Sequence, residues 1–520
     1  MPNKQKNYKY TMDLMPKLDN FGLLRLHTYH IIEKSYINTA NDSILRLTRR
    51  CLSVTLAQNV LNQTIKPNIK YKSILFSVFC AIFIPQIENK SMVHELRIKN
   101  FLSFKEETII SFEASKDTYN EDSLLITMSD GIRLSRIAII YGANASGKSN
   151  LLTAFEFLFW FWQRKTEDQE ISTGVEPFAL DIETPSLPSE FDLKLYINDK
   201  KYVYQLRLTN KVILSEKLFV YNSNQPSLLM QRELVNGNTI LKFNTSLTKV
   251  SAVVRDELTV KCLNNMSFFA ARKSVNCTLG EIDDARDWMI NHTLPVIDLG
   301  QNMFTYAESK MLDNTDAKNH LLGFSHNIGL NIEDMIVEKD YMSLTPEMIQ
   351  FMQSSGKLSD ENVSKLNKDP RMQTGFKTDF KVSVKNSRGA ETYTLPKSNQ
   401  SDGTLRAIGV ETAIYVAEQN NKLLPIDEIE SSLHPMLLKY MIKSFLKTES
   451  KSQLLLTTHY DPLLNAVDDY LRKDNFWFME KQDDGNSVLY SLVSKNGVNK
   501  MRSLQRAYLN GKLGAIPNIE

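Results

Sequence analysis

The sequence predicts an α/β protein in which a parallel sheet carries a phosphate-binding loop, accompanied by a β-rich lobe and a helical insertion. Three observations predict this class. Residues 136–157 run from an apolar segment through a glycine-containing loop into a helical pattern. A second apolar run, residues 423–426, ends in two carboxylates. Between residues 191 and 243, apolar and polar residues alternate in the manner of strands.

The first observation has the form of strand, loop and helix. Residues 137–140 are apolar, as a strand buried on both faces requires, and the loop 142–149 matches the spacing G-x-x-x-x-G-K-[ST]. Backbone N–H groups and a helix N-terminus then converge on an anion, Lys148 reaches the β- and γ-phosphates, and the Ser149 hydroxyl can bind Mg²⁺. We therefore expect a nucleoside triphosphate site rather than a purely structural glycine turn. The residues expected to bind the nucleotide are Gly142, Asn144, Ala145, Ser146, Gly147, Lys148, Ser149 and Asn150.

The composition is that of an ordinary soluble globular protein with room for two or more domains, because the 520 residues are 42% hydrophobic and 23% charged. The net charge of +2 hides an asymmetry: residues 1–91 hold 13 Lys and Arg against 5 Asp and Glu, and residues 92–520 hold 49 against 55. The apolar run 74–84 is much shorter than the roughly 20 residues of a membrane span and lies too deep for a secretory signal. We expect no membrane partner and a cytoplasmic location.

Residues 1–91 carry no phosphate-binding or catalytic motif. An alternating pattern begins at Met92, so Met92 is a candidate for the natural start; the alternative is that residues 1–91 form a real helical appendage. Neither a disulfide framework nor a zinc site is indicated, because the four cysteines include no C-x-x-C pair. These cysteines are Cys51, Cys80, Cys262 and Cys277.

The segment after the loop helix is expected to be β-rich. Residues 191–197 and 201–208 alternate around a turn at residues 198–199, which predicts a hairpin, and residues 212–221 and 239–243 continue the pattern. From about residue 248 to residue 369 the pattern becomes helical without sustained heptads, so long coiled-coil arms are not expected. The predicted domains are 1–91 (extension), 92–247 (first half with the β-rich lobe), 248–390 (helical insertion) and 391–520 (second half).

The carboxylates after residues 423–426 are Asp427 and Glu428. In phosphate-loop enzymes an acidic residue at the end of such a strand holds Mg²⁺ through water or the loop hydroxyl, so Asp427 and Ser149 are the expected metal site. Glu428 is the expected general base, which would polarise the attacking water. The alternative is that the pair only caps a helix N-terminus.

Two further elements surround this pair. A Ser-x-Gly turn, Ser401 to Gly403, opens a helical pattern and forms a second candidate anion-binding N-terminus. The apolar run 454–456 leads to His459, which we expect to contact the γ-phosphate, against the alternative of a structural histidine.

The order of these elements resembles the ABC/SMC/RecF class of P-loop ATPases over most of residues 92–520. The segments DEIESSLHP, SDGTLR, TTHYDPLL and SLQRAYLNGKLGAIP resemble more closely the RloA/AbiLii-like and overcoming-lysogenization-defect (OLD)-like bacterial ATPases, which are AAA-family ATP-binding proteins. The resemblance implies that the Ser401 turn is the signature motif, that Asp427 and Glu428 are the Walker B pair, that residues 430–435 form the D-loop region and that His459 is the switch histidine.

The resemblance also implies a homodimer or higher oligomer. ATP with Mg²⁺ would lie between the P-loop of one copy and the Ser401/Gly403 turn of the other, and hydrolysis to ADP and phosphate would drive a switch in anti-phage defence, or abortive infection, with a neighbour-encoded effector. The sequence departs from the wider class by having Ser-Asp-Gly-Thr as its signature. A glutamine-loop residue is not assigned, since Gln163 precedes the β-rich lobe. No Toprim nuclease is expected, because Asp483 to Asn486 has the pattern of a hairpin turn.

Two alternatives stay open. A RecF-like DNA-binding ATPase in repair or replication would need a basic groove near the β-rich lobe, although residues 92–520 are net acidic. The second alternative is a structural protein that binds a toxin and keeps it inactive. The basic residues that could line the groove are Lys200, Lys201, Lys211, Lys217, Arg272 and Lys273.

Overall fold

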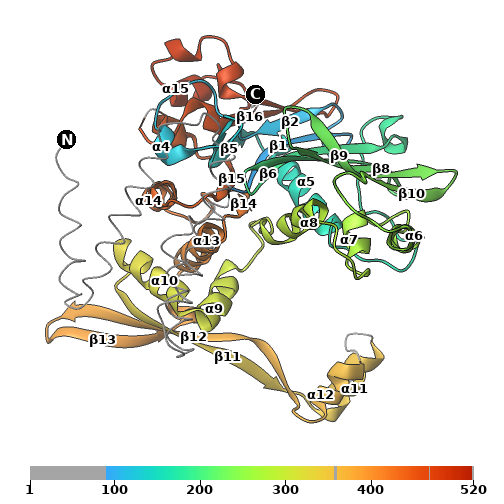
Figure 1. Ribbon diagram of the computed structural model, residues 1–520. Coiled ribbons are helices and arrows are strands. Elements are labelled where there is room, and N and C mark those ends of the chain that lie inside the picture. The colour runs from blue at the N-terminus through green and yellow to red at the C-terminus, as the bar shows by residue number, and fades with distance from the viewer. Residues whose placement is uncertain (1–89, 356–359, 468, 518–520) are drawn as a thin grey trace, which may run out of the picture. The chain divides into compact units, whose positions relative to one another are not determined.

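The computed structural model describes residues 90–355, 360–467 and 469–517, all of which belong to one compact unit, Glu88–Glu520 (Figure 1). The predictions for the N-terminal extension, including the apolar run 74–84 and two of the cysteines, fall outside the described residues. Within the described ranges no helix combines the length and the apolar character of a membrane span. The other two cysteines, Cys262 and Cys277, are both free thiols.

A five-stranded sheet lies at the centre of the fold, in the order β14-β15-β5-β16-β17. Its first four strands are parallel, and β17 pairs antiparallel with β16. Every residue of β5, β15 and β14 is buried, which explains why these strands are apolar runs in the sequence. The strands are β5 (Ile137–Gly142), β14 (Leu423–Ile426), β15 (Gln453–Thr458), β16 (Phe476–Lys481) and β17 (Ser487–Ser491).

The strand β14 ends the five-stranded sheet and contains Pro425, which has no N–H group to donate. On its outer side β14 exchanges backbone hydrogen bonds with residues 292–297, and the Asp427 N–H donates to the Ile297 carbonyl at 2.8 Å. Alternation along the strand places the Pro425 nitrogen on this irregular side and not toward β15. The proline is therefore tolerated, and the carboxylate that follows the strand has a fixed backbone.

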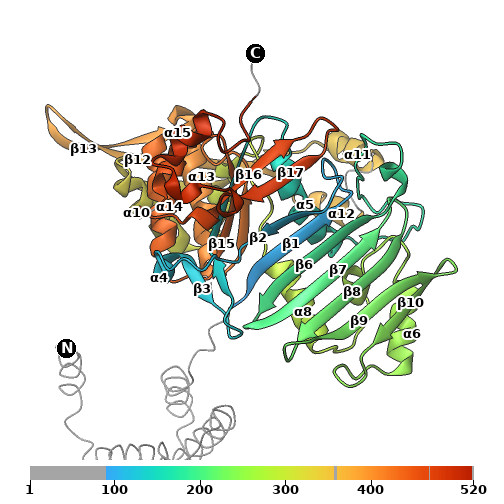
Figure 2. The same ribbon diagram turned by 90° about the horizontal axis from the view of Figure 1, so that it is seen from above.

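The predicted β-rich lobe is a seven-stranded antiparallel sheet in the order β10-β9-β8-β7-β6-β1-β2 (Figure 2). The predicted hairpin is confirmed, since Asn198 and Asp199 both have positive φ angles between β6 and β7. The strand β9 was not predicted, because its apolar residues are consecutive instead of alternating. The strands are β1 (Met92–Lys99), β2 (Thr108–Ser111), β6 (Ser189–Ile197), β7 (Lys200–Leu208), β8 (Ile213–Tyr221), β9 (Pro226–Val235) and β10 (Asn238–Phe243).

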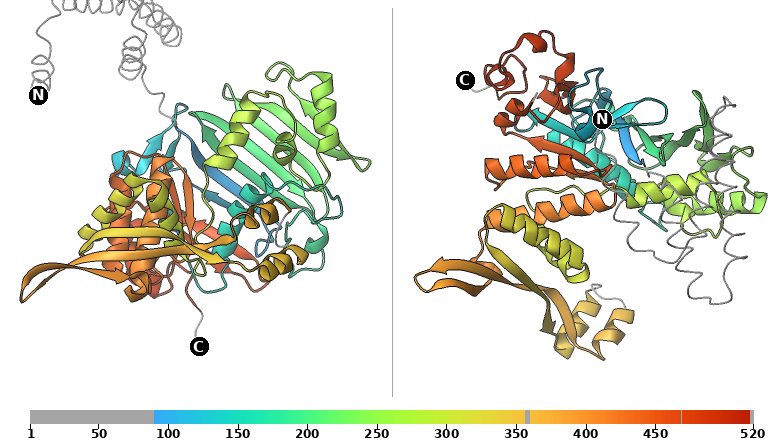
Figure 3. Two further views of the ribbon diagram at one scale, coloured as in Figure 1. Left: turned by 90° about the horizontal axis from the view of Figure 1, so that it is seen from below. Right: turned by 60° about the vertical axis from the view of Figure 1, so that its left-hand side comes forward.

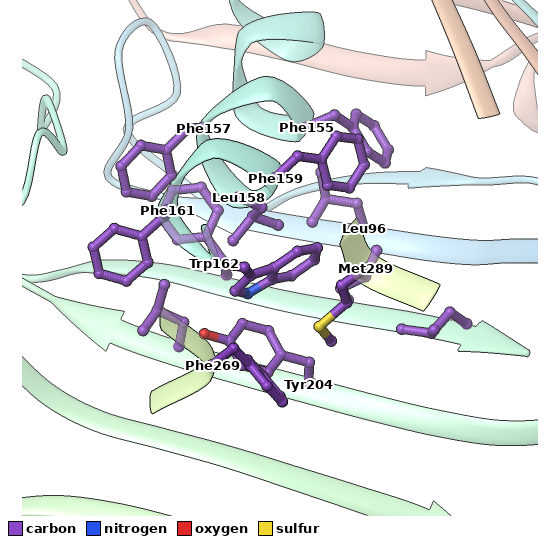
Figure 4. Close-up of a cluster of buried hydrophobic side chains, with 14 of the residues drawn as sticks. Leu96, Phe155, Phe157, Leu158, Phe159, Phe161, Trp162, Tyr204, Phe269 and Met289 are labelled. Atoms are coloured by element: carbon purple, nitrogen blue, oxygen red, sulfur yellow. The ribbon is translucent and has the colours of Figure 1, made fainter. Parts of the chain in front are cut away.

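The P-loop helix α5 (Lys148–Phe161) joins the two sheets (Figures 1 and 4). Its aromatic side chains pack against the inner face of the lobe, where Trp162, just beyond the helix, lies edge-on to Tyr204 with ring centroids 5.3 Å apart. The helices α7 (Phe268–Arg272) and α8 (Glu281–Asn291) contribute to the same core, and Figure 3 (left) shows helices across this face. Large aromatic residues contribute strongly to core energetics, so the loop is carried by a rigid helix.

The predicted helical insertion is only partly helical. It contains α6 (Ala252–Lys261), α7 to α10 and the pair α11–α12, but also a three-stranded antiparallel sheet in the order β11-β12-β13. The expectation of helices alone is wrong at β11 (Ile332–Ser343) and β12 (Arg371–Asn386), and the boundary expected at residue 390 falls inside β13 (Gly389–Pro396). The remaining helices here are α9 (Met303–Asp313), α10 (Thr315–Asn327), α11 (Pro346–Ser354) and α12 (Asp360–Leu366).

The sequence of β11 explains the error. A register shift between Ile332 and Asp334 places its buried residues, Ile332 and Met335, three positions apart, which is the spacing of a helix face. Beyond Lys339 the strand is exposed on both sides and has no apolar alternation. Figure 3 (right) shows this long ribbon beside α9 and α10, with α11 and α12 at its far end.

The C-terminal part returns to the central sheet. The turn predicted at residues 483–486 is confirmed as the β16–β17 connection, with Gly485 at a positive φ. The remaining helices are α4 (Glu121–Leu124), α13 (Asp402–Gln419), α14 (Pro435–Lys447) and α15 (Leu504–Leu509). The short elements are β3 (Leu125–Thr127), β4 (Arg133–Ser135), η1 (Thr184–Ser186), η2 (Lys397–Asn399), η3 (Asp461–Ala466), η4 (Lys473–Asn475), η5 (Leu492–Ser494) and η6 (Val498–Lys500).

Candidate functional site

The loop between β5 and α5 is compact, and its two glycines are sterically required. A Cβ atom on Gly142 would lie 2.5 Å from the Ser146 hydroxyl oxygen and 2.6 Å from the Met479 carbonyl oxygen. Gly147 has φ 107° and leaves no room for a side chain beside Ser487. Around them the loop presents an exposed rim and a buried base: Asn144, Ala145 and Ser149 are exposed, Asn150 is half-buried, and Ser146 and Lys148 are buried.

The hairpin of β16 and β17 packs against the loop and supports it. The Ser487 hydroxyl donates to the Ser146 carbonyl at 2.7 Å, and the Ser487 N–H donates to the Ser103 carbonyl at 2.8 Å. The Asn486 side chain accepts from the Lys105 N–H at 2.8 Å. The sequence offers no signal for these supporting residues, because they come from segments far from the loop in the chain.

The Lys148 ammonium group is fully engaged. It donates to the carbonyl oxygens of Gly142 at 2.9 Å and Ala143 at 3.1 Å, and it lies 3.0 Å from His459 Nε2. An ammonium group only donates, so the imidazole accepts at Nε2 and is neutral. Burial lowers the pKa of Lys148; burial, followed by the charge of Lys148, lowers the pKa of His459. The predicted switch histidine therefore meets the predicted P-loop lysine directly.

The predicted metal residues also meet. The Ser149 hydroxyl donates to Asp427 Oδ2 at 2.7 Å, and the Thr457 hydroxyl donates to Asp427 Oδ1. A hydroxyl and a carboxylate at this separation are oxygen ligands of the kind that Mg²⁺ binds. Within the described part of the chain no group of three His, Cys, Asp or Glu side chains could hold a metal ion. A Mg²⁺ ion here would therefore take its other ligands from phosphates and water, which is its usual habit at nucleotide sites.

Glu428 sits on a sharp turn directly after Asp427. Its φ is 45°, a conformation unusual for a residue other than glycine, and its N–H donates to the Thr457 hydroxyl at 2.9 Å. Its carboxylate lies 3.9 Å from His459 Nε2 and is about one-third exposed. Thr457 thus fixes both predicted acidic residues, a role that the sequence analysis missed because a threonine at a strand end carries no distinctive pattern.

Glu430 ties the D-loop region to the switch histidine. It accepts from the His459 N–H through one oxygen and from the Thr458 hydroxyl through the other, the latter at 2.7 Å. Like Thr457, this side chain fixes the end of β15. The imidazole is consequently held between Lys148 and the carboxylates that follow β14.

The signature turn has different surroundings. Ser401 is the N-cap of α13: its hydroxyl accepts from the Thr404 N–H at 3.2 Å, and Ser401 is exposed. Gly403 packs against the D-loop region, where a Cβ atom would lie 2.7 Å from the Ser432 carbonyl oxygen. Among the described residues, the hydrogen bonds of Ser401 connect it to its own helix and not to the P-loop.

Gln301 lies close to β14, and the sequence analysis gave this residue no role. It follows the segment 292–297 that pairs with β14 and shortly precedes α9. Its amide nitrogen donates to the Val296 carbonyl at 3.0 Å and approaches Asp298 Oδ2 at 3.3 Å. The sequence does not indicate that residues 292–297 pair with β14, because this segment contains Pro295 and lacks the alternation of a strand.

Of the six basic residues considered for DNA contact, two form ion pairs. Lys200 pairs with Glu281, and Arg272 pairs with Asp283 at 2.9 Å. Lys201 lies over the rings of Tyr196 and Tyr221, with its ammonium nitrogen 5.8 and 5.5 Å from their centroids. No observation at these positions favours a nucleic-acid interface.

A comparison with models of known protein families finds one match. The family model described as "AAA domain, putative AbiEii toxin, Type IV TA system" matches residues 137–465, from the start of β5 into η3. This stretch is more than half of the chain and contains the residues predicted to form the P-loop, the signature turn, the Walker B pair and the switch histidine. A search of curated proteins finds no match.

Among solved structures, the chain is similar to an SMC head domain from Thermotoga maritima, with 14% identity, a TM-score of 0.32, and coverage of 77% of this chain and 98% of that one. It is also similar to an SMC head bound to the C-terminal winged-helix domain of ScpA, with 12% identity, a TM-score of 0.35, and coverage of 80% and 99%. A third, from Pyrococcus furiosus, is an SMC head with an extended coiled coil bound to the C-terminal domain of ScpA; it has 13% identity, a TM-score of 0.29, and coverage of 81% and 99%.

Proposed function

Because the chain belongs to the AAA domain family described as putative AbiEii toxins of type IV toxin–antitoxin systems, and has an ABC/SMC-like architecture, we propose that it binds ATP with Mg²⁺ and hydrolyses it to ADP and phosphate. The observation that carries this proposal is the 2.7 Å hydrogen bond from the Ser149 hydroxyl to Asp427 Oδ2. It joins the P-loop to Walker B, with Glu428 next in the chain. A glycine turn with a purely structural role would not need this acidic partner.

The P-loop residues would bind the phosphates. In the structure Lys148 has three neutral acceptors, namely two carbonyl oxygens and the His459 imidazole. A triphosphate offers anionic oxygens in their place, and charge-assisted hydrogen bonds are roughly twice as strong as neutral ones. Binding therefore draws Lys148 away from His459 and leaves the imidazole free to face the terminal phosphate.

Ser149 and Asp427 would hold the Mg²⁺ ion, since their oxygens already lie within hydrogen-bond distance of each other. When bound, the ion supplies positive charge that offsets the negative charge developing on the phosphate oxygens. Thr457 keeps Asp427 oriented through its second oxygen.

Glu428 would act as the general base. Its backbone is fixed by Thr457, and its partly exposed carboxylate is on the same side of the sheet as His459, 3.9 Å from Nε2. A carboxylate in this position can accept a proton from a water molecule aligned with the terminal phosphate. His459 would orient the phosphate through a hydrogen bond.

We propose further that two copies enclose the nucleotide. Ser401 and Asp402 are exposed at the N-terminus of α13 and are available to a second molecule. The N-terminus of an 18-residue helix favours a negative charge. Cycles of ATP binding and hydrolysis would then join and separate two heads, as a homodimer or a larger assembly, in cytoplasmic anti-phage defence with a neighbour-encoded effector.

The test is Glu428→Gln, which keeps the shape of the side chain but cannot accept a proton in the same way. We expect unchanged ATP binding, turnover reduced at least about 100-fold, and dimer accumulation with ATP in light-scattering measurements. Asp483→Asn, at an exposed hairpin turn, is the matched control and should behave as wild type. Equal turnover by Glu428→Gln and wild type would contradict the assignment. Phage plating with the flanking genes, comparing the same two variants, tests the defence role separately.

A further inference from the structure

The C-terminal segment 503–517 is not used by the proposed function, although its sequence stood out. Its helix α15 packs against η3, the turn that begins two residues after His459. The buried side of α15 consists of Leu504, Ala507 and Tyr508. The helix α15 therefore packs against the turn that closely follows the predicted switch histidine.

Gln505 makes the polar connection between α15 and this loop. Its amide nitrogen donates to Asp461 Oδ2 at 2.6 Å, and its amide oxygen accepts from Asn465 Nδ2 at 2.7 Å. Both ends of one amide thus bind residues near the two ends of η3. A hydrogen bond to a carboxylate is among the stronger ones.

The same loop is fixed on its other side by Glu430, which accepts from the His459 N–H and the Thr458 hydroxyl. Between the two attachments the Tyr460 carbonyl accepts from the Tyr141 hydroxyl at 2.9 Å. Tyr141 belongs to the P-loop strand β5, and its ring meets the Tyr508 ring of α15 edge-on at 5.4 Å. The imidazole position therefore depends on contacts from both sides of the loop.

The C-terminal segment is itself anchored to the sheet. The Ala515 N–H donates to Glu480 Oε1 at 2.7 Å, and the Leu513 carbonyl accepts from the Tyr490 hydroxyl at 2.8 Å. Gly514 has φ 74°, and a side chain there would collide with the Glu480 carboxylate. Because β16 and β17 hold this segment, α15 is a fixed support for η3.

We propose that Gln505 is a positioning residue for ATP hydrolysis: from α15 it fixes η3 and thereby holds the backbone of His459 beside the P-loop, where the imidazole can face the terminal phosphate once Lys148 has turned to the nucleotide. This inference rests on the proposed function for its effect on turnover. It deepens that function by making the C-terminal helix part of the apparatus that aligns the terminal phosphate. Small displacements of aligned groups are costly, because a shift of about 1 Å can lower a rate by about 100-fold.

The test compares Gln505→Ala with Arg506→Ala in the full chain. Arg506 is the exposed neighbour on the same helix, which makes it a matched control. In hydrogen–deuterium exchange without nucleotide, Gln505→Ala should raise the exchange rate of peptides covering residues 457–466 about 10-fold or more, whereas Arg506→Ala should leave it unchanged. In steady-state assays, Gln505→Ala should lower kcat about 10-fold with KM for ATP within about twofold.

A donor–acceptor exchange separates this role from general destabilisation. Gln505→Glu places two carboxylates together and should lower kcat as Gln505→Ala does. Combining it with Asp461→Asn restores one donor facing one acceptor, so kcat should return to within about threefold of wild type. Failure of the pair to recover, with thermal midpoints equal to wild type, would overturn the proposal.

The outcomes distinguish the two proposals. If the exchange of residues 457–466 is unchanged in Gln505→Ala, Gln505 does not fix η3, whether or not the chain hydrolyses ATP. Raised exchange with unchanged kcat, in a preparation whose wild type is active, overturns the positioning role and leaves the proposed ATPase intact. If the wild type does not hydrolyse ATP and Gln505→Ala shows raised exchange, both the positioning role and the ATPase proposal are overturned. The contact between Gln505 and η3 then has only a structural role.

Discussion

The nucleotide centre and the signature turn differ in how far one chain completes them. At the centre, Lys148 binds His459 and Ser149 binds Asp427, so residues from separate parts of the sequence already satisfy one another. At the signature turn, Ser401 caps its own helix and faces solvent. The difference is what an ATP-enclosing dimer requires, since one half of each site would be assembled within a chain and the other half supplied by a second copy. The predictions below test this division.

The largest effect is expected from Lys148→Ala. This change removes the ammonium group that would face the phosphates, and we expect ATP affinity to fall about 100-fold or more, because charge-assisted contacts to phosphate are lost. Titration with a fluorescent ATP analogue measures the change. Lys211→Ala, at an exposed position of the lobe, is the control and should bind as wild type. Wild-type affinity in Lys148→Ala would mean that the centre does not bind the triphosphate.

A smaller and different effect is expected from Gly403→Ala. The added methyl group would lie 2.7 Å from the Ser432 carbonyl oxygen, so the signature turn and the D-loop region must separate slightly. We expect ATP binding by the monomer to be unchanged, while ATP-dependent dimerisation and turnover fall about 10-fold. Gly323→Ala is the control, because a Cβ atom there meets no neighbour within 4 Å. Loss of monomer binding in Gly403→Ala would contradict the division between centre and turn.

The same division explains what could be predicted from the sequence. The strand, loop and helix at β5 and α5 are contiguous, and the two acidic residues follow a strand directly, so spacing alone identifies them. Thr457 and Gln505 lie in segments that carry the family resemblance, but they act through neighbours that are distant in sequence, and the resemblance assigns neither of them a role. Their roles depend on which strands and helices lie side by side, which a local pattern does not contain.

The fold was predictable for a similar reason. Buried parallel strands are apolar throughout, and the hairpin turn at Asn198 has residues suited to positive φ angles. By contrast, the helical insertion was expected to extend to residue 390, although Phe380, Val382 and Val384 in β12 alternate with polar residues as a strand requires. β12 pairs with β13 through a short hairpin and also with β11, which is further away in the sequence and lacks that alternation, so a local pattern does not reveal this second partner.

The smallest predicted effect concerns pH and applies to the centre alone. Burial, and then the charge of Lys148, lowers the pKa of His459 in the folded protein. The unfolded chain, where the histidine pKa is about 6.5, therefore binds the proton more readily as the pH falls. The stabilisation is fully present above that value and decreases as the pH falls below it. Burial also lowers the pKa of His94 and His292 and raises the pKa of Glu418 to about 7, so the wild-type change reflects these groups as well, with the contribution of Glu418 opposite in sign.

Urea unfolding at pH 8 and pH 5.5 measures this contribution. His459→Gln keeps an acceptor for Lys148 but cannot take up the proton, so its free energy of unfolding should fall less between the two pH values than that of wild type. Ser401→Ala changes the signature turn, where no histidine is involved, and should show the wild-type difference. If His459→Gln and wild type lose the same stability, the imidazole is not held neutral against Lys148. The contact between Lys148 and His459 would then not complete the centre within one chain.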